Sequence, residues 1–211
     1  MADLSTLFYK LMPYAPGLSE TVALKFMLEA ARLFCIQTQI IQQDLSPVVT
    51  SGADVTVPDP SASLSLCGFR RISSGGYTIW SKSSDALDGM LGYNDYKAIA
   101  STALPKSVVI SGFNTFSLVP APSASITLAI RTAVSPNDAT NVPSDLVARW
   151  YEAIVSGALM ELLTHPAQSY TNQGLASMHA AVFKAKVLEA RMRVNTSDSR
   201  HGSRVIGPKF I

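Results

Sequence analysis

The chain has 211 residues, of which 47% are hydrophobic and only 15% are charged, and its formal net charge at pH 7 is +2. This length is enough for one substantial domain, or for a helical part and a sheet part that share one core. The apolar runs are far shorter than the roughly 20 residues that cross a bilayer, and residues 1–10 lack the basic and apolar regions of a signal peptide. We therefore expect a soluble protein, intracellular when made, whose apolar surface is covered by neighbouring proteins.

Cys35 and Cys67 are the two cysteines, one in a helical pattern and one in a strand pattern. They form no CxxC pair and have no histidine near them in the sequence. This usage argues against a disulfide framework and against a zinc site. We expect both residues to behave as small buried hydrophobic side chains.

A first helix is predicted after the segment 13–18, with Ser19 as its N-cap and Glu20 in its first turn, where a carboxylate suits the helix dipole. Apolar residues recur at helical spacing from Ala23 onward, and the polar line between them is narrow. A helix with so wide an apolar arc is covered on more than one side. We expect the three residues that lie off its main stripe to form a subunit interface: Leu24, Leu28 and Cys35.

The middle of the chain, residues 44–134, has a different pattern. Short alternating segments rich in β-branched residues, such as 55–57, 77–79 and 126–130, are separated by turn residues such as those at 74–76. This pattern predicts an antiparallel sheet or a small sandwich that stands apart from the helices. The alternation with serine and threonine indicates that one face of the sheet is solvated.

Two further helices are predicted in the last third of the chain. One begins near Ser144 and stops at His165, which precedes a proline, and the other covers residues 172–193. Gly157 lies in the middle of the first of these helices, where glycine costs about 1 kcal/mol of helix propensity. A close approach between helices would offset that cost.

Residues 195–211 form a basic segment that ends in two large apolar residues, which a solvated tail has little reason to carry. We expect this tail to dock on a partner in an extended form, and an added strand on an exposed sheet edge is one way to hold it. The residues predicted to make this contact are Arg200, Arg204, Val205, Ile206, Lys209, Phe210 and Ile211.

These predictions define an α+β fold, in which a helical bundle of three main helices carries an antiparallel β-sheet or sandwich insertion and an extended C-terminal tail. Residues 1–43 would form the first helical part of the bundle, 44–134 the β-rich extension, 135–194 the second helical part and 195–211 the docking tail.

Motifs that carry chemistry are missing from the sequence. The histidines at 165, 179 and 201 have no metal-ligand spacing, and the common hydrolase, metalloprotease and nucleotide-binding signatures are absent. The carboxylates at 85, 88 and 95 are too sparse for a calcium site. The basic pair at 70–71 is more typical of a sheet rim than of a nucleic-acid platform, in which aromatic and basic residues alternate on one face. We therefore predict no catalytic, cofactor-binding or metal-binding residues, no cofactor, and a structural protein that is not an enzyme.

Several segments together resemble one family. The sequence Leu-Met-Pro-Tyr-Ala-Pro-Gly at 11–17 precedes a helix that contains Ala-Arg-Leu-Phe-Cys at 31–35. Later come a strand that ends in arginine at 125–131 and the segment Tyr-Glu-Ala-Ile-Val-Ser-Gly-Ala-Leu at 151–159. In this order they resemble the head-to-tail adaptor (connector) proteins of short-tailed bacteriophages, over about residues 11–190. The segments 60–64 and 81–95 depart from the family pattern.

The resemblance implies a ring of twelve subunits beneath the portal, at the head-tail junction of the virion, after assembly in the host cytoplasm. It implies contacts with other copies of the chain, with the portal protein through the C-terminal segment, and with a tail nozzle or tail tube protein. DNA would pass through the lumen without sequence-specific binding, and no membrane is involved. The alternatives are another neck or tail component, a cell-wall-binding or hydrolase-like virion module, and a small-ligand protein with a sandwich pocket.

Overall fold

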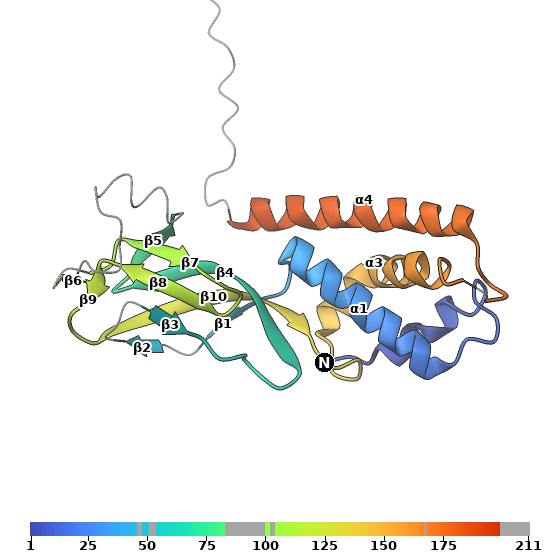
Figure 1. The fold of residues 1–211 in the computed structure, drawn as a ribbon, viewed down its shortest axis with the longest axis horizontal. Coiled ribbons are helices and arrows are strands. Elements are labelled where there is room, and N and C mark those ends of the chain that lie inside the picture. The colour runs from blue at the N-terminus through green and yellow to red at the C-terminus, as the bar shows by residue number, and fades with distance from the viewer. Residues whose placement is uncertain (46–47, 51–53, 83–99, 102–103, 167, 199–211) are drawn as a thin grey trace, which may run out of the picture.

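The computed structural model describes residues 1–45, 48–50, 54–82, 100–101, 104–166 and 168–198. The described chain is elongated, with a helical body at one end and a β-sheet at the other (Figure 1). This confirms the α+β class. The helices are the 3₁₀ helix η1 (Leu4–Lys10) and the α-helices α1 (Glu20–Thr38), α3 (Ser144–Leu162) and α4 (Gln173–Asp198). The strands are β1 (Gln42–Asp44), β2 (Val48–Thr50), β3 (Asp54–Thr56), β4 (Leu64–Ser74), β5 (Tyr77–Ser81), β6 (Ala100–Ser101), β7 (Ser107–Ile110), β8 (Thr115–Val119), β9 (Ala121–Pro122) and β10 (Ile126–Pro136).

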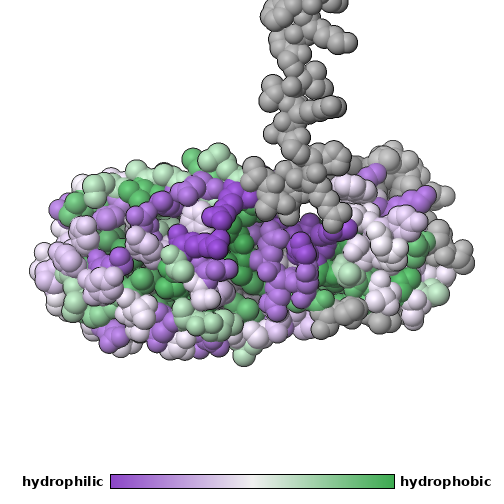
Figure 2. Space-filling model, turned by 180° about the vertical axis from the view of Figure 1, so that it is seen from behind, coloured by the Kyte–Doolittle hydropathy of each residue, from purple (hydrophilic) through white to green (hydrophobic). Residues whose placement is uncertain are grey.

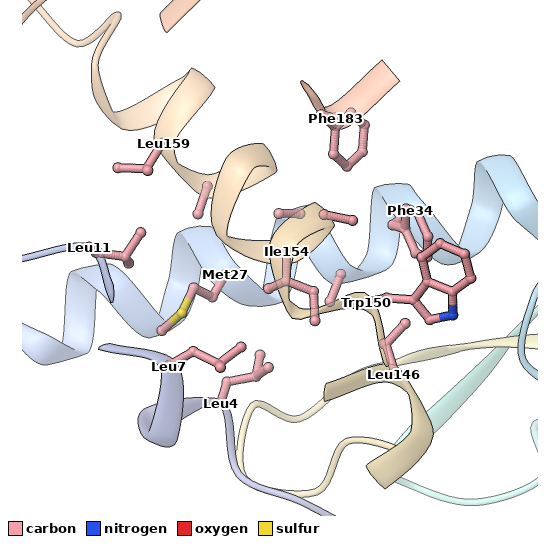
Figure 3. Close-up of a cluster of buried hydrophobic side chains, with 14 of the residues drawn as sticks. Leu4, Leu7, Leu11, Met27, Phe34, Leu146, Trp150, Ile154, Leu159 and Phe183 are labelled. Atoms are coloured by element: carbon pink, nitrogen blue, oxygen red, sulfur yellow. The ribbon is translucent and has the colours of Figure 1, made fainter. Parts of the chain in front are cut away.

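The helical body is built from α1, α3 and α4, with η1 packed against α1 and α3. Its apolar side chains converge on one core, part of which is shown in Figure 3. The labelled residues of this core come from η1 and the turn after it, and from all three α-helices: Leu4, Leu7, Leu11, Met27, Phe34, Leu146, Trp150, Ile154, Leu159 and Phe183.

Gly157 marks a close approach of three helices within this body. A Cβ added at Gly157 would lie 2.8 Å from the Cβ of Ala30 on α1 and 3.1 Å from the ring of Phe183 on α4. The sequence analysis expected a close approach between helices to offset the cost of a glycine in a helix, and this close approach is present.

The sheet has the strand order β1-β10-β4-β5-β7-β8-β3, with β2 also paired to β10, and β6 and β9 form a separate two-stranded pair. It is a single curled sheet, because side chains from both of its edges, such as Val48 and Val55, share one core. A hollow of about 380 Å³ lies between residues near one edge of the sheet, which are Gln43, Asp44, Leu45 and Val48, and the segment 57–60. The described strands therefore surround their core by curvature, whereas a sandwich would use two facing sheets.

The sequence analysis predicted an antiparallel sheet, and this is wrong for two of the strand pairs. β5 and β7 pair in parallel, with Trp80 opposite Ser107, and so do β6 and β9. A parallel pair needs a long connection that returns the chain to the same end of the sheet. The segment 82–106 between β5 and β7 supplies such a connection, which strand periodicity alone does not reveal.

The helical body and the sheet are joined by polar contacts at the end of α1. The Arg32 side chain donates from Nε to the carbonyl oxygen of Pro136 at 2.9 Å and from Nη2 to that of Asn137 at 3.0 Å. Arg70 on β4 donates to Gln39 Oε1 at 3.0 Å. The sheet is therefore tied to the helical body on two neighbouring strands.

The third predicted helix is longer than expected. α4 continues to Asp198, through residues 195–198 that were predicted to be extended. Its buried stripe gains one more member, Val194, one turn beyond Ala190. Packing of Val194 against the body carries the helix past its predicted end at Arg193, and the rest of the predicted tail, residues 199–211, lies outside the described residues.

Candidate functional site

The two histidines in the described part of the chain, His165 and His179, do not form a site. His165 is exposed and packs edge-on against Phe26, with ring centroids 5.3 Å apart. His179 on α4 is buried and meets the Tyr14 ring edge-on at 5.1 Å, and neither of its ring nitrogens has a hydrogen-bond partner among the described residues. Burial lowers the pKa of His179 below its ordinary value. The third predicted position, His201, lies outside the described residues.

The two cysteine thiols are buried and free. Burial raises the pKa of Cys67 to about 11, and burial together with the neighbouring Cys67 raises that of Cys35 further. The Cys67 Sγ lies 3.9 Å from the carbonyl oxygen of Cys35. Since the thiolate is the reactive form, both thiols are poor nucleophiles at neutral pH.

This geometry corrects the prediction that Cys35 is a subunit contact. Its exposed fraction is 0% within its own chain, where it belongs to the core of the helical body. The chain itself covers that part of the wide apolar arc, so no neighbouring subunit is needed there. Leu24 and Leu28 remain partly exposed, and their interface role stays a prediction.

The residues that could bind a metal ion, namely His, Cys, Asp and Glu, are dispersed over the described part of the molecule. In the described part of the chain, no group of three or more His, Cys, Asp or Glu residues lies close enough to hold a metal ion. Glu161 and Glu29 interact across α3 and α1, and burial together with the Glu29 charge raises the pKa of Glu161. The carboxylates at 85, 88 and 95 lie outside the described residues. Among the helices that the structure describes, none is long and apolar enough to pass through a membrane.

The basic pair on β4 is divided between two environments. Arg70 is tied to Gln39, whereas Arg71 is exposed. Phe69, which precedes them, packs edge-on against the Phe116 ring at 5.1 Å. The aromatic residue of this segment therefore belongs to the sheet core. The basic pair lies within β4, which has β10 on one side and β5 on the other, and not at a strand end on the rim of the sheet as expected.

A hollow of about 500 Å³ lies at the junction of the two parts of the molecule. It is lined by Ile41 and Gln42 at the start of the sheet, by Arg149 and Trp150 of α3, and by residues of α4 that include Arg193. Arg193 and Val194, one turn before the end of α4, border this hollow. The predicted docking tail therefore continues from a place where the helical body meets the sheet.

Large apolar side chains also reach the surface, which is the feature that fits a protein of an assembly. On the helical body they lie on η1 and the loop after it, on α1, and on the outer side of α4. Seen from the other side, hydrophobic residues reach the edge where α4 lies, and a hydrophilic zone crosses the middle of this face (Figure 2). The sequence analysis predicted this helix but not its outer apolar stripe, although the residues of that stripe have helical spacing. The main exposed residues of the helical body are Tyr9, Met12, Val22, Ile36, Met178, Val182, Leu188 and Met192.

The sequence model of the SU10 adaptor protein family matches residues 3–207, which is nearly the whole chain. A search of curated proteins finds no match.

Proposed function

Because this chain belongs to the SU10 adaptor protein family, we propose that it is the head-to-tail adaptor of a short-tailed bacteriophage and joins the portal to the tail tube or nozzle. Membership of the family makes it a bacteriophage adaptor, a structural protein of the virion. The family match over residues 3–207 is the observation that carries this proposal.

The proposed working form is a ring of twelve subunits at the head-tail junction, with DNA passing through its lumen without sequence-specific recognition. A ring subunit must bury two flanks against identical neighbours. The low charged fraction of 15% and the apolar side chains exposed on several helices support this form. In this proposal the protein is not an enzyme, and its partners are other copies of itself, the portal protein and one tail protein.

The parts of the chain would divide this work. Residues 1–43 and 135–194 would form the helical bundle, and residues 44–134 the β-rich extension. The segment 195–211 would dock on the portal, with its first turn in α4. The elongated arrangement, with helices at one end and the sheet at the other, supports such a division (Figure 1).

Imaging of purified particles tests the proposal directly. We expect a ring of this protein between the portal and the tail, with twelve-fold symmetry, and we expect particles made without the protein to carry portals that lack tails. Antibody labelling of the protein at the distal tip of the tail would contradict the proposal, and so would its absence from particles.

A further inference from the structure

The longest helix, α4, has two apolar faces. Its buried residues, which include Phe183, Val187 and Ala190, recur at intervals of three and four and pack on α1 and α3. A second stripe on the opposite face is exposed to solvent, with Leu188 at 59% and Met192 at 64% exposure. We call this stripe the outer α4 face, and its large residues are Met178, Val182, Leu188 and Met192. A surface helix that packs on one partner normally has one apolar stripe, so a second stripe calls for a second partner.

Another exposed apolar surface lies across the helical body. Tyr9 on η1 and Met12 just after it are exposed at 63% and 52%, and Val22 in the first turn of α1 is also exposed. We call these three residues the η1 face. Figure 1 shows α4 along one side of the helical body, and η1 with the N-terminus on the other side. The two faces are therefore different surfaces of one subunit, carried by different elements.

The charges of the two surfaces differ. α4 is net positive, with Lys184, Lys186, Arg191 and Arg193 against Glu189 and Asp198. The N-terminal segment 1–22 is close to neutral, because Asp3 and Glu20 are balanced by Lys10 and the α-amino group of Met1. An α4-to-α4 contact between copies would place two net positive helices together, whereas a contact between α4 and the N-terminal segment avoids this repulsion.

We propose that the outer α4 face of one copy packs on the η1 face of the next copy, head to tail. This inference rests on the proposed adaptor function, since it supplies the contact between neighbours in the ring. A contact between two different surfaces closes a ring when its rotation divides a full turn, whereas a contact of one surface with itself stops at a dimer.

Cysteine cross-linking within particles tests this contact. The full chain would carry Met12→Cys together with Leu188→Cys, and a short bismaleimide would join thiols of neighbouring copies. The native Cys35 and Cys67 are buried, and their raised pKa values keep them unreactive. We expect a ladder of dimer, trimer and higher species on a denaturing gel, while either single variant stays at monomer size. The pair Tyr9→Cys and Met192→Cys repeats the test on independent positions.

A matched control uses an exposed apolar residue elsewhere. Leu188→Cys with Phe113→Cys, which lies in the loop between β7 and β8 and is also highly exposed, should give no ladder. A dimer from Leu188→Cys alone would overturn the proposal in favour of self-contact of α4. Particles that contain the protein but give no ladder with either pair would overturn it and leave the adaptor function intact. Absence of the protein from particles would instead refute the adaptor function.

Discussion

At the scale of single residues, Gly157 shows how packing overrides local propensity. In an isolated helix, alanine at this position would be favoured by about 1 kcal/mol. Here the added methyl group would be placed 2.8 Å from the Ala30 Cβ and against the Phe183 ring. We predict that Gly157→Ala lowers the free energy of unfolding by about 1–3 kcal/mol through overpacking, measured by urea denaturation.

A second glycine provides the control for this prediction. Gly174 is exposed in the first turn of α4, and an added Cβ there would meet the Asn172 Oδ1 at 3.4 Å, with nothing closer. Gly174→Ala should therefore leave stability unchanged or raise it. If Gly157→Ala were as stable as Gly174→Ala, the three helices would not be as closely packed as described.

His179 predicts a dependence of stability on pH. Burial holds its pKa in the folded state below its unfolded value, which is about 6.5. The unfolded state therefore binds the proton more readily, so this residue's contribution to stability is complete above that pH and declines as the pH falls. The variant His179→Phe keeps a ring against Tyr14. We predict that its unfolding free energy increases relative to that of the native chain when the pH is lowered from 7.5 to 5.

The native chain and His179→Phe must be compared, because Glu161 changes the stability of both proteins with pH in the direction opposite to His179. Its raised pKa makes the folded state favour the protonated carboxyl, so its contribution to stability increases as the pH falls. The difference between native and variant unfolding free energies cancels this effect. A difference that does not change between pH 5 and 7.5 would show that His179 is protonated as easily in the folded state as in the unfolded one.

At the scale of elements, the helices could be predicted because their ends are marked by residues close together in the sequence. The N-cap at Ser19 and the start near Ser144 place the first turns of α1 and α3, and the predicted start at residue 172 lies one residue from that of α4. The parallel pairing of β5 with β7, by contrast, joins two strands that are distant in the sequence, and no local signal gives their relative direction. Periodicity also shows that a side chain is covered without showing what covers it, which is why Cys35 was assigned to a neighbouring subunit.

Arg32 couples the elements of the two parts, and its removal should loosen that junction. The change Arg32→Met keeps the apolar stem but leaves the carbonyl oxygens of Pro136 and Asn137 without these donors. Hydrogen bonds to charged groups contribute about 1.5–3 kcal/mol each, and we predict a loss of this size in unfolding free energy for the whole cluster. Faster hydrogen exchange at the end of β10 would locate the effect.

Lys25→Met on the same helix serves as the comparison, since Lys25 is exposed. Substitution of such a surface residue usually changes stability by less than about 0.5 kcal/mol. Equal losses in the two variants would mean that Arg32 acts through its charge on α1 and not through its contacts with the end of β10.

At the scale of the whole molecule, the functional surfaces were only partly predictable. The family resemblance came from dispersed segments of the sequence, and the family match over residues 3–207 agrees with it at the level of a phage adaptor. The outer α4 face was missed because one apolar stripe already accounted for the helix. Only the packed structure shows which of two stripes is used within the subunit, and therefore which one is left for a partner.

The last prediction concerns the tail, which acts on the assembly and not on the fold. The buried residues of the two main cores all lie at or before Ala190, so removal of residues 204–211 should leave the thermal unfolding of the subunit unchanged. Burial of Phe210 and Ile211 in a partner would contribute about 1.5–3 kcal/mol each, before the cost of ordering the segment. A ring multiplies such weak contacts through avidity. We therefore predict that the truncated protein no longer sediments with portal rings.

Two further variants separate the apolar and the charged contributions of this tail. Alanine at Phe210 and Ile211 together should weaken sedimentation with portals at every salt concentration, because apolar burial is insensitive to screening. Glutamine at Arg204 and Lys209 should weaken it mainly at low salt, where ion pairs with an acidic partner or with phosphates are strongest. If the truncated chain binds portals as tightly as the full chain, the portal contact must be made by the helical body, and the outer α4 face would then be the first surface to test.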